Sequence, residues 1–238
     1  MSGPDDSRVP GGGLTPAPAT SAAGTICTGA RDAIIVVDVQ RDFCPGGAMP
    51  VPGGREVIPV INHILPYFGR WIYTRDWHPV THVSFATQPE FDDFSWPPHA
   101  VQGTPGAEWC EGLEMPMNAI LVSKGDDPQC EAYSGFQVQR LDLAEFLRLR
   151  KVERIFVCGL ALDYCVRQTA LDARAAGFTV YLLEDAVRAI TPEGAARTLA
   201  ELEAVGVIRL RSDQVADSGE RPPAAYDQDG NPIHHHDD

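Results

Sequence analysis

The side chain with the clearest chemical potential in this sequence is Cys165, which lies in the first turn of a predicted helix. An apolar run ending at Cys158 predicts a buried strand, small residues then predict a tight turn, and Asp163 opens the helix. A helix N-terminus carries a partial positive charge and backbone N–H groups that lack intrahelical partners. These groups lower the pKa of a thiol and can bind an oxyanion. The segment therefore predicts a nucleophile beside an oxyanion hole.

Two charged residues follow other predicted strands. Asp38 closes the first strand and Lys124 follows the third. A carboxylate beside a thiol could take and return one proton, and a nearby ammonium group would favour both the carboxylate and the thiolate. Each residue alone has an ordinary explanation, since a cysteine in a helix is often a small core residue and an aspartate after a strand often forms a turn. Together with Cys165 they indicate a cysteine hydrolase.

A second cluster follows the predicted second strand. In an extended segment Asp76 and His78 point the same way, so they could bind one ion together with His99 from the next loop. Two imidazoles and a carboxylate suit Zn²⁺, Fe²⁺ or Mn²⁺ and leave coordination positions open. His82 is a further candidate ligand, although a histidine in an exposed loop is a common alternative.

These residues need a scaffold that brings the strand ends together. The predicted strands cover residues 33–38, 71–74, 119–123, 154–158, 178–183 and 207–210. The predicted helices cover residues 56–68, 141–150, 163–176 and 192–204. Alternating strands and helices imply a parallel sheet covered on both faces, and ligands bind beyond the carboxyl ends of such strands. We expect an α/β fold of three layers, α/β/α, with a central, mainly parallel sheet of about six strands.

Composition divides the chain into one domain and two tails. Residues 1–30 are rich in Gly, Pro, Ser, Thr and Ala and predict a disordered tail. Residues 31–212 form the predicted domain, and residues 213–238 predict a disordered acidic tail. Its His234–His236 run could bind a metal, but an inert tail is the preferred interpretation.

The net charge of −14 argues against a nucleic-acid or anionic-membrane partner. No apolar run approaches the roughly 20 residues of a membrane span, and no secretory signal is recognisable. We therefore expect a cytoplasmic protein with a small-molecule substrate; a homo-oligomer is compatible with the sequence, but no pattern specifies one. In that compartment six cysteines indicate free thiols rather than a disulfide framework.

Several motifs occur in the order typical of one enzyme family. They are DVQRDF at 38–43, TRDWH at 74–78, HVSFA at 82–86, WPPH at 96–99, GTPG at 103–106, KGDD at 124–127, AYSGF at 132–136 and GLALDYCV at 159–166. Over about residues 32–212 the chain resembles the nicotinamidases, within the isochorismatase-like cysteine hydrolases. The resemblance implies a Rossmann-like fold and metal-dependent deamidation of nicotinamide to nicotinate and ammonia through a cysteine thioester. It also implies a role in NAD salvage, with pyrazinamide as a second substrate.

The same resemblance implies roles for individual residues. It assigns Asp38, Lys124 and Cys165 to a catalytic triad, and the oxyanion hole to the N–H groups of Ala161 and Cys165. It also implies a cis peptide between Leu160 and Ala161. The residues assigned to substrate binding are Phe43, Trp96, Tyr133, Leu160 and Gln40, the last of them near a metal-bound water.

For the cofactor, the resemblance implies one divalent ion that binds the pyridine nitrogen. We expect Zn²⁺, with Fe²⁺ and Mn²⁺ as alternatives. Asp76, His78 and His99 are the implied ligands, and His82 matches a position that is a ligand in some members and contacts a metal-bound water in others.

Two departures from the family pattern leave the catalytic atoms in place. Leu162 stands where threonine is usual, and Ala100 stands where cysteine is frequent. The alternatives are an N-carbamoyl or ureidoacrylate-type amidase, which generally lacks the metal ligands, and a non-catalytic relative, which usually lacks a triad residue.

Overall fold

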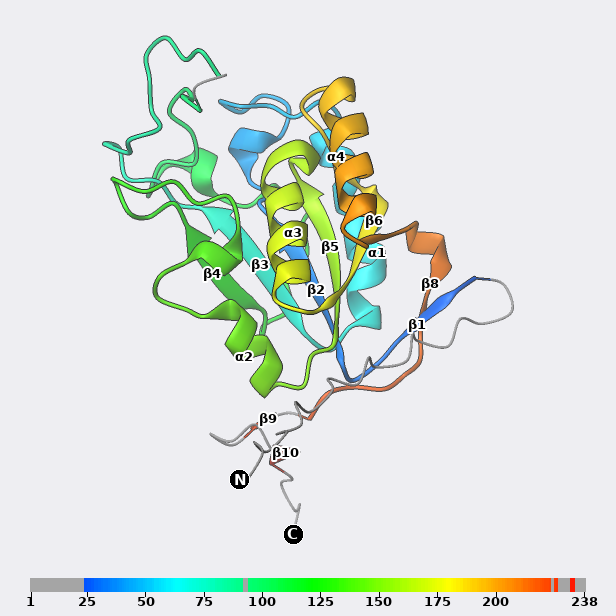
Figure 1. Ribbon diagram of the computed structural model, residues 1–238. Helices are drawn as coiled ribbons and strands as arrows, with labels where there is room; N and C mark the ends of the chain where they lie inside the picture. Colours follow the sequence, from blue (N-terminus) through cyan, green and yellow to red (C-terminus); the bar gives the residue numbers. More distant parts are fainter. Residues whose placement is uncertain (1–23, 92–93, 224, 227–231, 234–238) are drawn as a thin grey trace, which may run out of the picture.

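Six parallel strands form the centre of the molecule (Figure 1). The computed structural model describes residues 24–91, 94–223, 225–226 and 232–233. The strands lie in the order β4-β3-β2-β5-β6-β7, and every neighbouring pair is parallel. Their bounds are β2 Asp32–Val37, β3 Trp71–Asp76, β4 Ile120–Lys124, β5 Arg154–Leu160, β6 Thr179–Arg188 and β7 Ile208–Leu210. The predicted parallel α/β sheet is confirmed.

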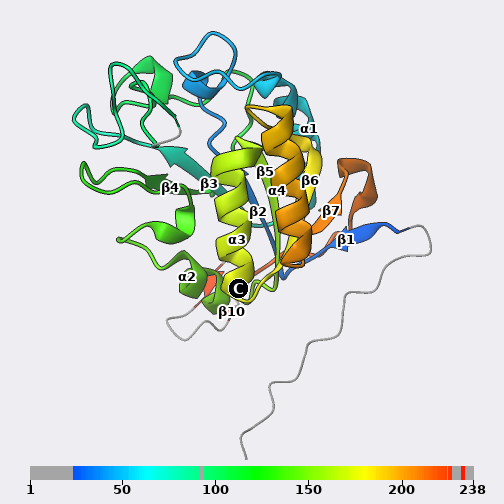
Figure 2. The same ribbon diagram turned by 45° about the horizontal axis from the view of Figure 1, so that its top comes forward.

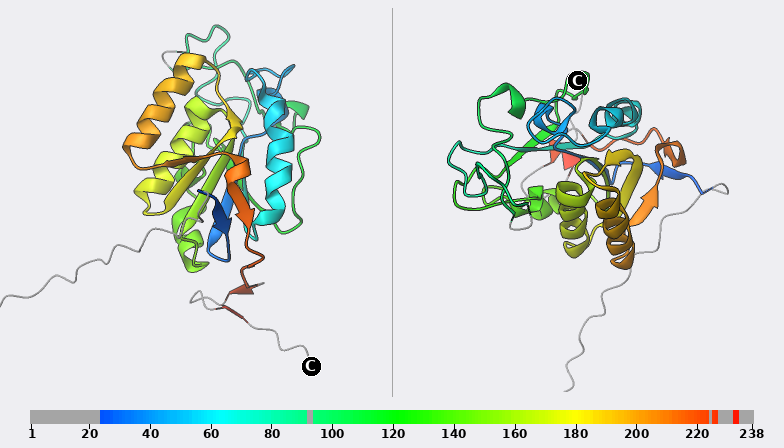
Figure 3. Two further views of the ribbon diagram at one scale, coloured as in Figure 1. Left: turned by 90° about the vertical axis from the view of Figure 1, so that its right-hand side faces the viewer. Right: turned by 90° about the horizontal axis from the view of Figure 1, so that it is seen from above.

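Helices cover both faces of this sheet, as the left panel of Figure 3 shows edge-on. The helices are α1 Val57–Ile64, α2 Leu143–Leu149, α3 Arg167–Ala175 and α4 Pro192–Ala204. In β2, Ile34 and Val36 belong to the core beneath α1, whereas Ile35 and Val37 belong to the core beneath the other three helices. Burial on both faces explains why this strand is a continuous apolar run. Among the described helices, none has the length and hydrophobicity that a bilayer crossing requires.

The strand order places a crevice at the centre of the carboxyl edge. From β2 the chain moves outward through β3 to β4, and then returns to lay β5 on the other side of β2. Ligands bind at such a reversal in open α/β sheets. Figure 2 shows the long loops after β2 and β3 gathered above this edge.

Short strands lie outside the predicted domain of residues 31–212, on both sides of it. Strand β1, Ile26–Thr28, pairs in parallel with β8, Val215–Asp217, and Ile26 and Val215 are buried in the core. Two short strands, β9 Ala225–Tyr226 and β10 Pro232–Ile233, pair with each other. Strands of two or three residues are too short to show a periodic pattern in the sequence. Their pairing depends on a partner strand that is distant in the sequence or equally short. Most of residues 1–30 and the His234–His236 run lie outside the described residues.

The prediction of six free thiols is wrong for two cysteines, since Cys44 and Cys110 form a disulfide. The segment containing Cys110 folds back on the loop after β2, where the Cys110 N–H donates to the Val39 carbonyl at 2.9 Å. This long-range return brings together two residues that are 66 positions apart. The described free cysteines are Cys27, Cys130, Cys158 and Cys165.

Candidate functional site

Asp38, Lys124 and Cys165 meet at the carboxyl end of the sheet. They follow or end β2, β4 and β5, so the parallel strand order delivers all three to one edge. Lys124 Nζ lies 2.7 Å from Asp38 Oδ2 and 3.3 Å from Cys165 Sγ. All three side chains are buried. The predicted acid–base and nucleophilic groups are therefore in mutual contact around one ammonium group.

The Asp38 carboxylate is fixed by its neighbour on β3. Asp38 has a φ of 47°, a left-handed conformation that a residue with a Cβ adopts only when its surroundings impose it. Its N–H donates to the Thr74 carbonyl at 3.0 Å, and Thr74 Oγ1 donates to Asp38 Oδ1 at 2.7 Å. These two bonds explain how β3 turns the carboxylate toward Lys124.

Burial controls the proton affinities of this cluster. Desolvation raises the pKa of Asp38 and outweighs the opposing effect of Lys124. Desolvation also raises the pKa of Cys165, so the depressed thiol pKa expected at a helix N-terminus is wrong. Burial opposes the charge of Lys124, but the carboxylates of Asp38 and Asp76 raise its pKa well above the usual range. Burial therefore favours the protonated forms of Asp38 and Cys165, whereas the two carboxylates favour the charged form of Lys124.

The backbone around Cys165 is unusual, as the sequence motif implied. The peptide bond between Leu160 and Ala161 is cis. A π-helical turn, Leu162–Val166, follows it and carries Cys165. The Tyr164 N–H donates to the Ala161 carbonyl at 3.1 Å and closes the turn. The residues predicted for the oxyanion hole therefore lie on one short segment.

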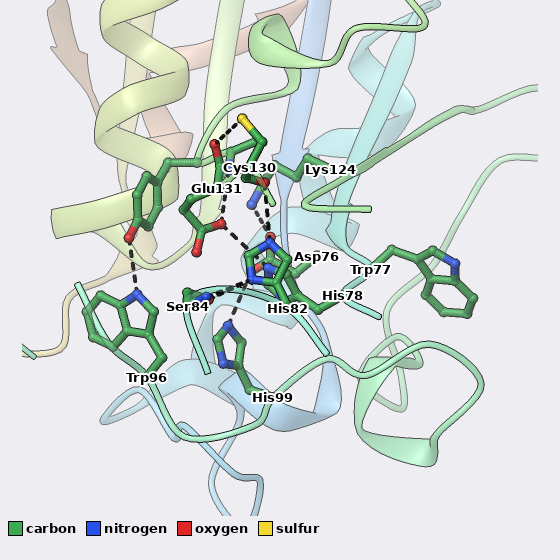
Figure 4. A network of polar contacts seen from close by, with 12 residues as sticks. Asp76, Trp77, His78, His82, Ser84, Trp96, His99, Lys124, Cys130 and Glu131 are labelled. Carbon is green, nitrogen blue, oxygen red and sulfur yellow. Dashed lines mark hydrogen bonds and ion pairs between the residues drawn. The ribbon is translucent and has the colours of Figure 1, made fainter. Parts of the chain in front are cut away.

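Asp76, His78 and His99 offer a cluster of metal-binding atoms (Figure 4). One ligand atom from each lies within 4.8 Å of the others, and all three residues are buried. Among the described residues, neither ring nitrogen of His78 has a hydrogen-bond partner. His99 Nδ1 pairs with the Pro97 carbonyl at 2.8 Å, and its Nε2 faces Asp76 Oδ2 at 3.9 Å. Buried imidazole nitrogens of this kind fit a divalent metal ion.

His82 and Glu131 flank this cluster. The rings of His82 and His78 are 4.4 Å apart, but both His82 nitrogens have partners: Ser84 Oγ at 2.8 Å and the Cys130 carbonyl at 3.3 Å. Glu131 lies 3.5 Å from His78 Nε2; burial opposes its charge, but His78 lowers the pKa of this carboxyl to about 2. The sequence analysis did not single out Glu131. Its position two residues before Tyr133, a predicted pocket residue, was the only indication.

An apolar pocket of about 440 Å³, including its open part, lies above Cys165. The predicted wall residues Phe43, Trp96, Tyr133 and Leu160 all line it. Trp96 Nε1 donates to Tyr133 Oη at 3.1 Å, which holds two aromatic rings in place. The sequence analysis missed four other lining residues. Tyr164 precedes Cys165 on the same turn, and Met49, Val51 and Ile190 come from other loops.

Gln40 does not line this pocket, although it was predicted to contact substrate. Its side chain is fully buried, and its amide nitrogen donates to the carbonyls of Asp76 and Ala107 at 2.8 and 2.9 Å. Its amide oxygen accepts the Asp76 N–H at 2.8 Å. All of these bonds go to backbone, so Gln40 holds the Asp76 backbone in position instead of facing a ligand.

Comparison with known proteins agrees with this geometry. The isochorismatase domain family model matches residues 32–214. A nicotinamidase of Acinetobacter baylyi is 37% identical over 201 residues, covering 77% of this chain and 94% of that protein. The pyrazinamidase of Pyrococcus horikoshii, solved in complex with zinc, has a TM-score of 0.69 and 46% identity over 76% of this chain and 99% of its own. A protein of L. infantum, solved in complex with nicotinate, has a TM-score of 0.72 and 38% identity, covering 80% of this chain and 99% of its own.

Proposed function

Because the chain belongs to the isochorismatase family, we propose that it is an amidohydrolase that converts nicotinamide to nicotinate and ammonia. The observation that carries this proposal is the position of Lys124 Nζ, in contact with both Asp38 and Cys165 beneath an aromatic pocket. Relatives that are nicotinamidases and pyrazinamidases support an amide of a small aromatic ring as the substrate. Pyrazinamide is the second substrate that we propose.

In the first half of the reaction, Asp38 takes the proton of Cys165 and the sulfur attacks the carboxamide carbon. Lys124 stabilises the thiolate as it forms, because its ammonium group lies 3.3 Å from the sulfur. The N–H groups of Ala161 and Cys165 hold the oxyanion, and each donor of this kind contributes about 3 kcal/mol. The carbon–nitrogen bond then breaks, ammonia leaves with the proton from Asp38, and a thioester remains.

In the second half, Asp38 takes a proton from water while the water oxygen attacks the thioester carbon. The carbon–sulfur bond breaks, nicotinate is released, and the proton returns to Cys165. The raised pKa of Asp38 suits this role, since a general base must also hold the proton between steps. Lys124 keeps its charge throughout, because two carboxylates contact it.

We further propose that Asp76, His78 and His99 hold one divalent metal ion. When bound there, the ion would bind the pyridine nitrogen and so orient the ring. His78 supports this site, because neither of its buried ring nitrogens has a hydrogen bond among the described residues, and its Nε2 has only the ion-pair contact with Glu131 at 3.5 Å. Zinc is the ion we propose, because the Pyrococcus relative was solved with zinc; Fe²⁺ and Mn²⁺ suit the same ligands.

Ammonia release from nicotinamide tests the activity, and Cys165→Ala tests the nucleophile. We expect steady release by the wild type and a loss of at least about 1,000-fold in kcat for the variant, since the thioester can no longer form. Cys27→Ala is the matched control, because Cys27 is an exposed free cysteine on β1. Near-normal turnover by Cys165→Ala would refute the nucleophile assignment. Turnover of an N-carbamoyl amide in place of nicotinamide would move the substrate assignment to the alternative amidases.

Metal removal tests the proposed ion with a readout besides activity. Treatment with a chelator should abolish ammonia release, and added Zn²⁺ should restore it. Metal that binds only the folded state at 100 times its Kd adds about 2.7 kcal/mol to the free energy of unfolding, so the thermal midpoint should also rise. His78→Ala should remove this rise. A chelated, metal-free protein with full activity would contradict the proposed role of the metal.

A further inference from the structure

Asp163 lies two residues before Cys165 and makes a contact that no step of the mechanism uses. Its carboxylate accepts the Ile190 N–H at 3.0 Å through Oδ1 and at 3.2 Å through Oδ2. Oδ2 also accepts the Thr191 N–H at 3.3 Å. One carboxylate therefore links the π-helical turn that carries Cys165 to the segment between β6 and α4.

The first turn of α4 is shaped to receive this carboxylate. Thr191 is the N-cap of α4, and its Oγ1 accepts the Gly194 N–H at 2.9 Å. A Cβ added at Gly194 would lie 2.4 Å from Asp163 Oδ2, so only glycine leaves room for the carboxylate. The positive end of the helix dipole also favours a negative charge at this place. The first turn of α4 therefore leaves space for the Asp163 carboxylate, which belongs to the π-helical turn Leu162–Val166 that carries Cys165. We call this segment the nucleophile turn.

The segment that Asp163 holds is part of the pocket wall. Ile190 lines the pocket that also exposes Cys165 and Ala161. The nucleophile and this wall come from different parts of the chain. Cys165 lies on the π-helical turn after β5, and Ile190 lies 25 positions later, between β6 and α4. The Asp163 carboxylate links these two segments directly, through the hydrogen bonds that it accepts from Ile190 and Thr191. These bonds fix the sulfur of Cys165 relative to the pocket wall at Ile190.

We propose that Asp163 is a positioning residue that holds Cys165 and the Ile190 wall in register for the attack on the amide carbon. The inference rests on the proposed function, because it assigns Asp163 to the same reaction. Asp163 forms no bond to the substrate and transfers no proton. Its contribution is geometric, and a displacement of about 1 Å in a reacting group can cost about 100-fold in rate.

Asp163→Ala removes all three hydrogen bonds, and Asp163→Asn keeps the shape while losing the charge and one acceptor. We expect kcat to fall by about 10- to 100-fold in the alanine variant and by less in the asparagine variant, with KM raised in both because Ile190 is released. Asp142→Ala is the matched control. Asp142 is also a helix-capping aspartate, accepting the Glu145 N–H at 2.9 Å on α2, and its loss should lower stability without changing kcat or KM.

A double variant separates positioning from a general loss of stability. Gly194→Ala alone should displace the carboxylate and reproduce the kinetic defect of Asp163→Ala. In the Asp163→Ala background the contact at 2.4 Å is gone, although Thr191 Oγ1 still lies 2.8 Å from the added Cβ. Gly194→Ala should therefore cause a smaller loss of kcat there than in the wild-type background. Additive losses of kcat would overturn the proposal. A folded Asp163→Ala protein with wild-type kcat and KM would also overturn it.

A readout independent of deamidation keeps this inference separate from the proposed function. The rate at which iodoacetamide alkylates Cys165, followed by peptide mass spectrometry, reports the contact of the sulfur with Lys124. We expect slower alkylation in Asp163→Ala and Gly194→Ala than in wild type and Asp142→Ala. If the wild type releases no ammonia from nicotinamide, the proposed function fails, yet the alkylation rates still decide the role of Asp163. Equal rates in all four proteins would overturn that role.

Discussion

At the scale of single residues, the two oxygens of Asp38 have different partners. Oδ1 accepts the hydroxyl of Thr74, and Oδ2 faces the ammonium group of Lys124. Desolvation raises the pKa of this carboxyl, while Lys124 and Thr74 oppose the rise. The base is therefore balanced between burial, which favours its proton, and two neighbours that favour its charge. Small changes in those neighbours should move the balance.

Thr74→Val should shift the pH dependence of catalysis. The hydroxyl of Thr74 stabilises the ionised carboxylate, so its removal should raise the pKa of Asp38. Since Asp38 acts as a base only when ionised, the acid limb of kcat/KM should move to higher pH. A hydrogen bond to a charged group contributes about 1.5–3 kcal/mol, which corresponds to a shift of about one to two pH units. The measurement is kcat/KM for ammonia release across the acid range.

The matched control for this variant is Thr169→Val on α3. Thr169 is also fully buried, but its Oγ1 has no hydrogen-bond partner among the described residues. The control should leave the acid limb where the wild type has it. An unchanged acid limb in Thr74→Val, with the protein folded, would contradict the proposed role of Asp38.

The placement of reactive residues at strand ends could be predicted from the sequence, but the burial and hydrogen-bond partners of each residue could not. The positions of Asp38, Lys124 and Cys165 at or after the carboxyl ends of three parallel strands were enough to bring them together. The raised pKa of Cys165 was not predictable, because it depends on burial contributed by the whole surrounding structure. The hydrogen bonds of Gln40 were not predictable for a similar reason, since its partners are backbone groups that only the folded loops supply.

At the scale of elements, the close contact between β2 and β5 determines where the nucleophile turn begins. Gly159 ends the regular part of β5 with a φ of 112°, and a Cβ at this position would lie 2.1 Å from the Val37 carbonyl oxygen. The strand register also shifts between Val157 and Gly159 in the pairing with β6. Glycine therefore allows β5 to leave the sheet directly beside Asp38.

Gly159→Ala should strongly destabilise the protein. Backbone strain at positive φ and a clash with main-chain atoms should together lower the free energy of unfolding by about 3 kcal/mol or more. Gly177→Ala is the matched control, because Gly177 has a φ of 93° but nothing within 4 Å of an added Cβ. The control should lose about 1 kcal/mol. Urea denaturation measures both, and equal losses would show that the contact with β2 is not the cause.

Element types followed from the periodicity of the sequence, whereas several boundaries depended on local chemistry. Helix α1 ends at Ile64, earlier than predicted, and Leu65–Tyr67 forms a 3-10 turn around Pro66, which has no N–H to continue an α-helix. The first turn around Cys165 is π-helical, where the sequence predicted an α-helix. Such turns are frequent at functional sites, but apolar periodicity does not distinguish them from α-helices.

At the scale of the whole molecule, two short strands that are far apart in the sequence pair with each other. Strands β1 and β8 lie side by side at the lower right of Figure 1. Ile26 is buried, and Thr28 Oγ1 donates to the Tyr67 carbonyl at 2.6 Å beneath the end of α1. The domain that we propose therefore extends beyond residues 31–212 to include both strands. Through Ile26 and Val215, this pair contributes to the core under α1.

Truncation at two positions tests this extension of the domain. A chain that starts at residue 31 should be less stable than one that starts at residue 24, because only the latter contains β1. Burial of Ile26 contributes about 1.5–3 kcal/mol and the Thr28 hydrogen bond about 0.5–1.5 kcal/mol, so we expect the free energy of unfolding to differ by about 2–4.5 kcal/mol. Urea denaturation gives this difference, and kcat for ammonia release should be equal in the two chains.

Val215→Ala on β8 should destabilise the longer chain more than the shorter one, because its partner Ile26 is present only in the longer chain. Equal stabilities of the two chains would place the domain boundary at residue 31 after all.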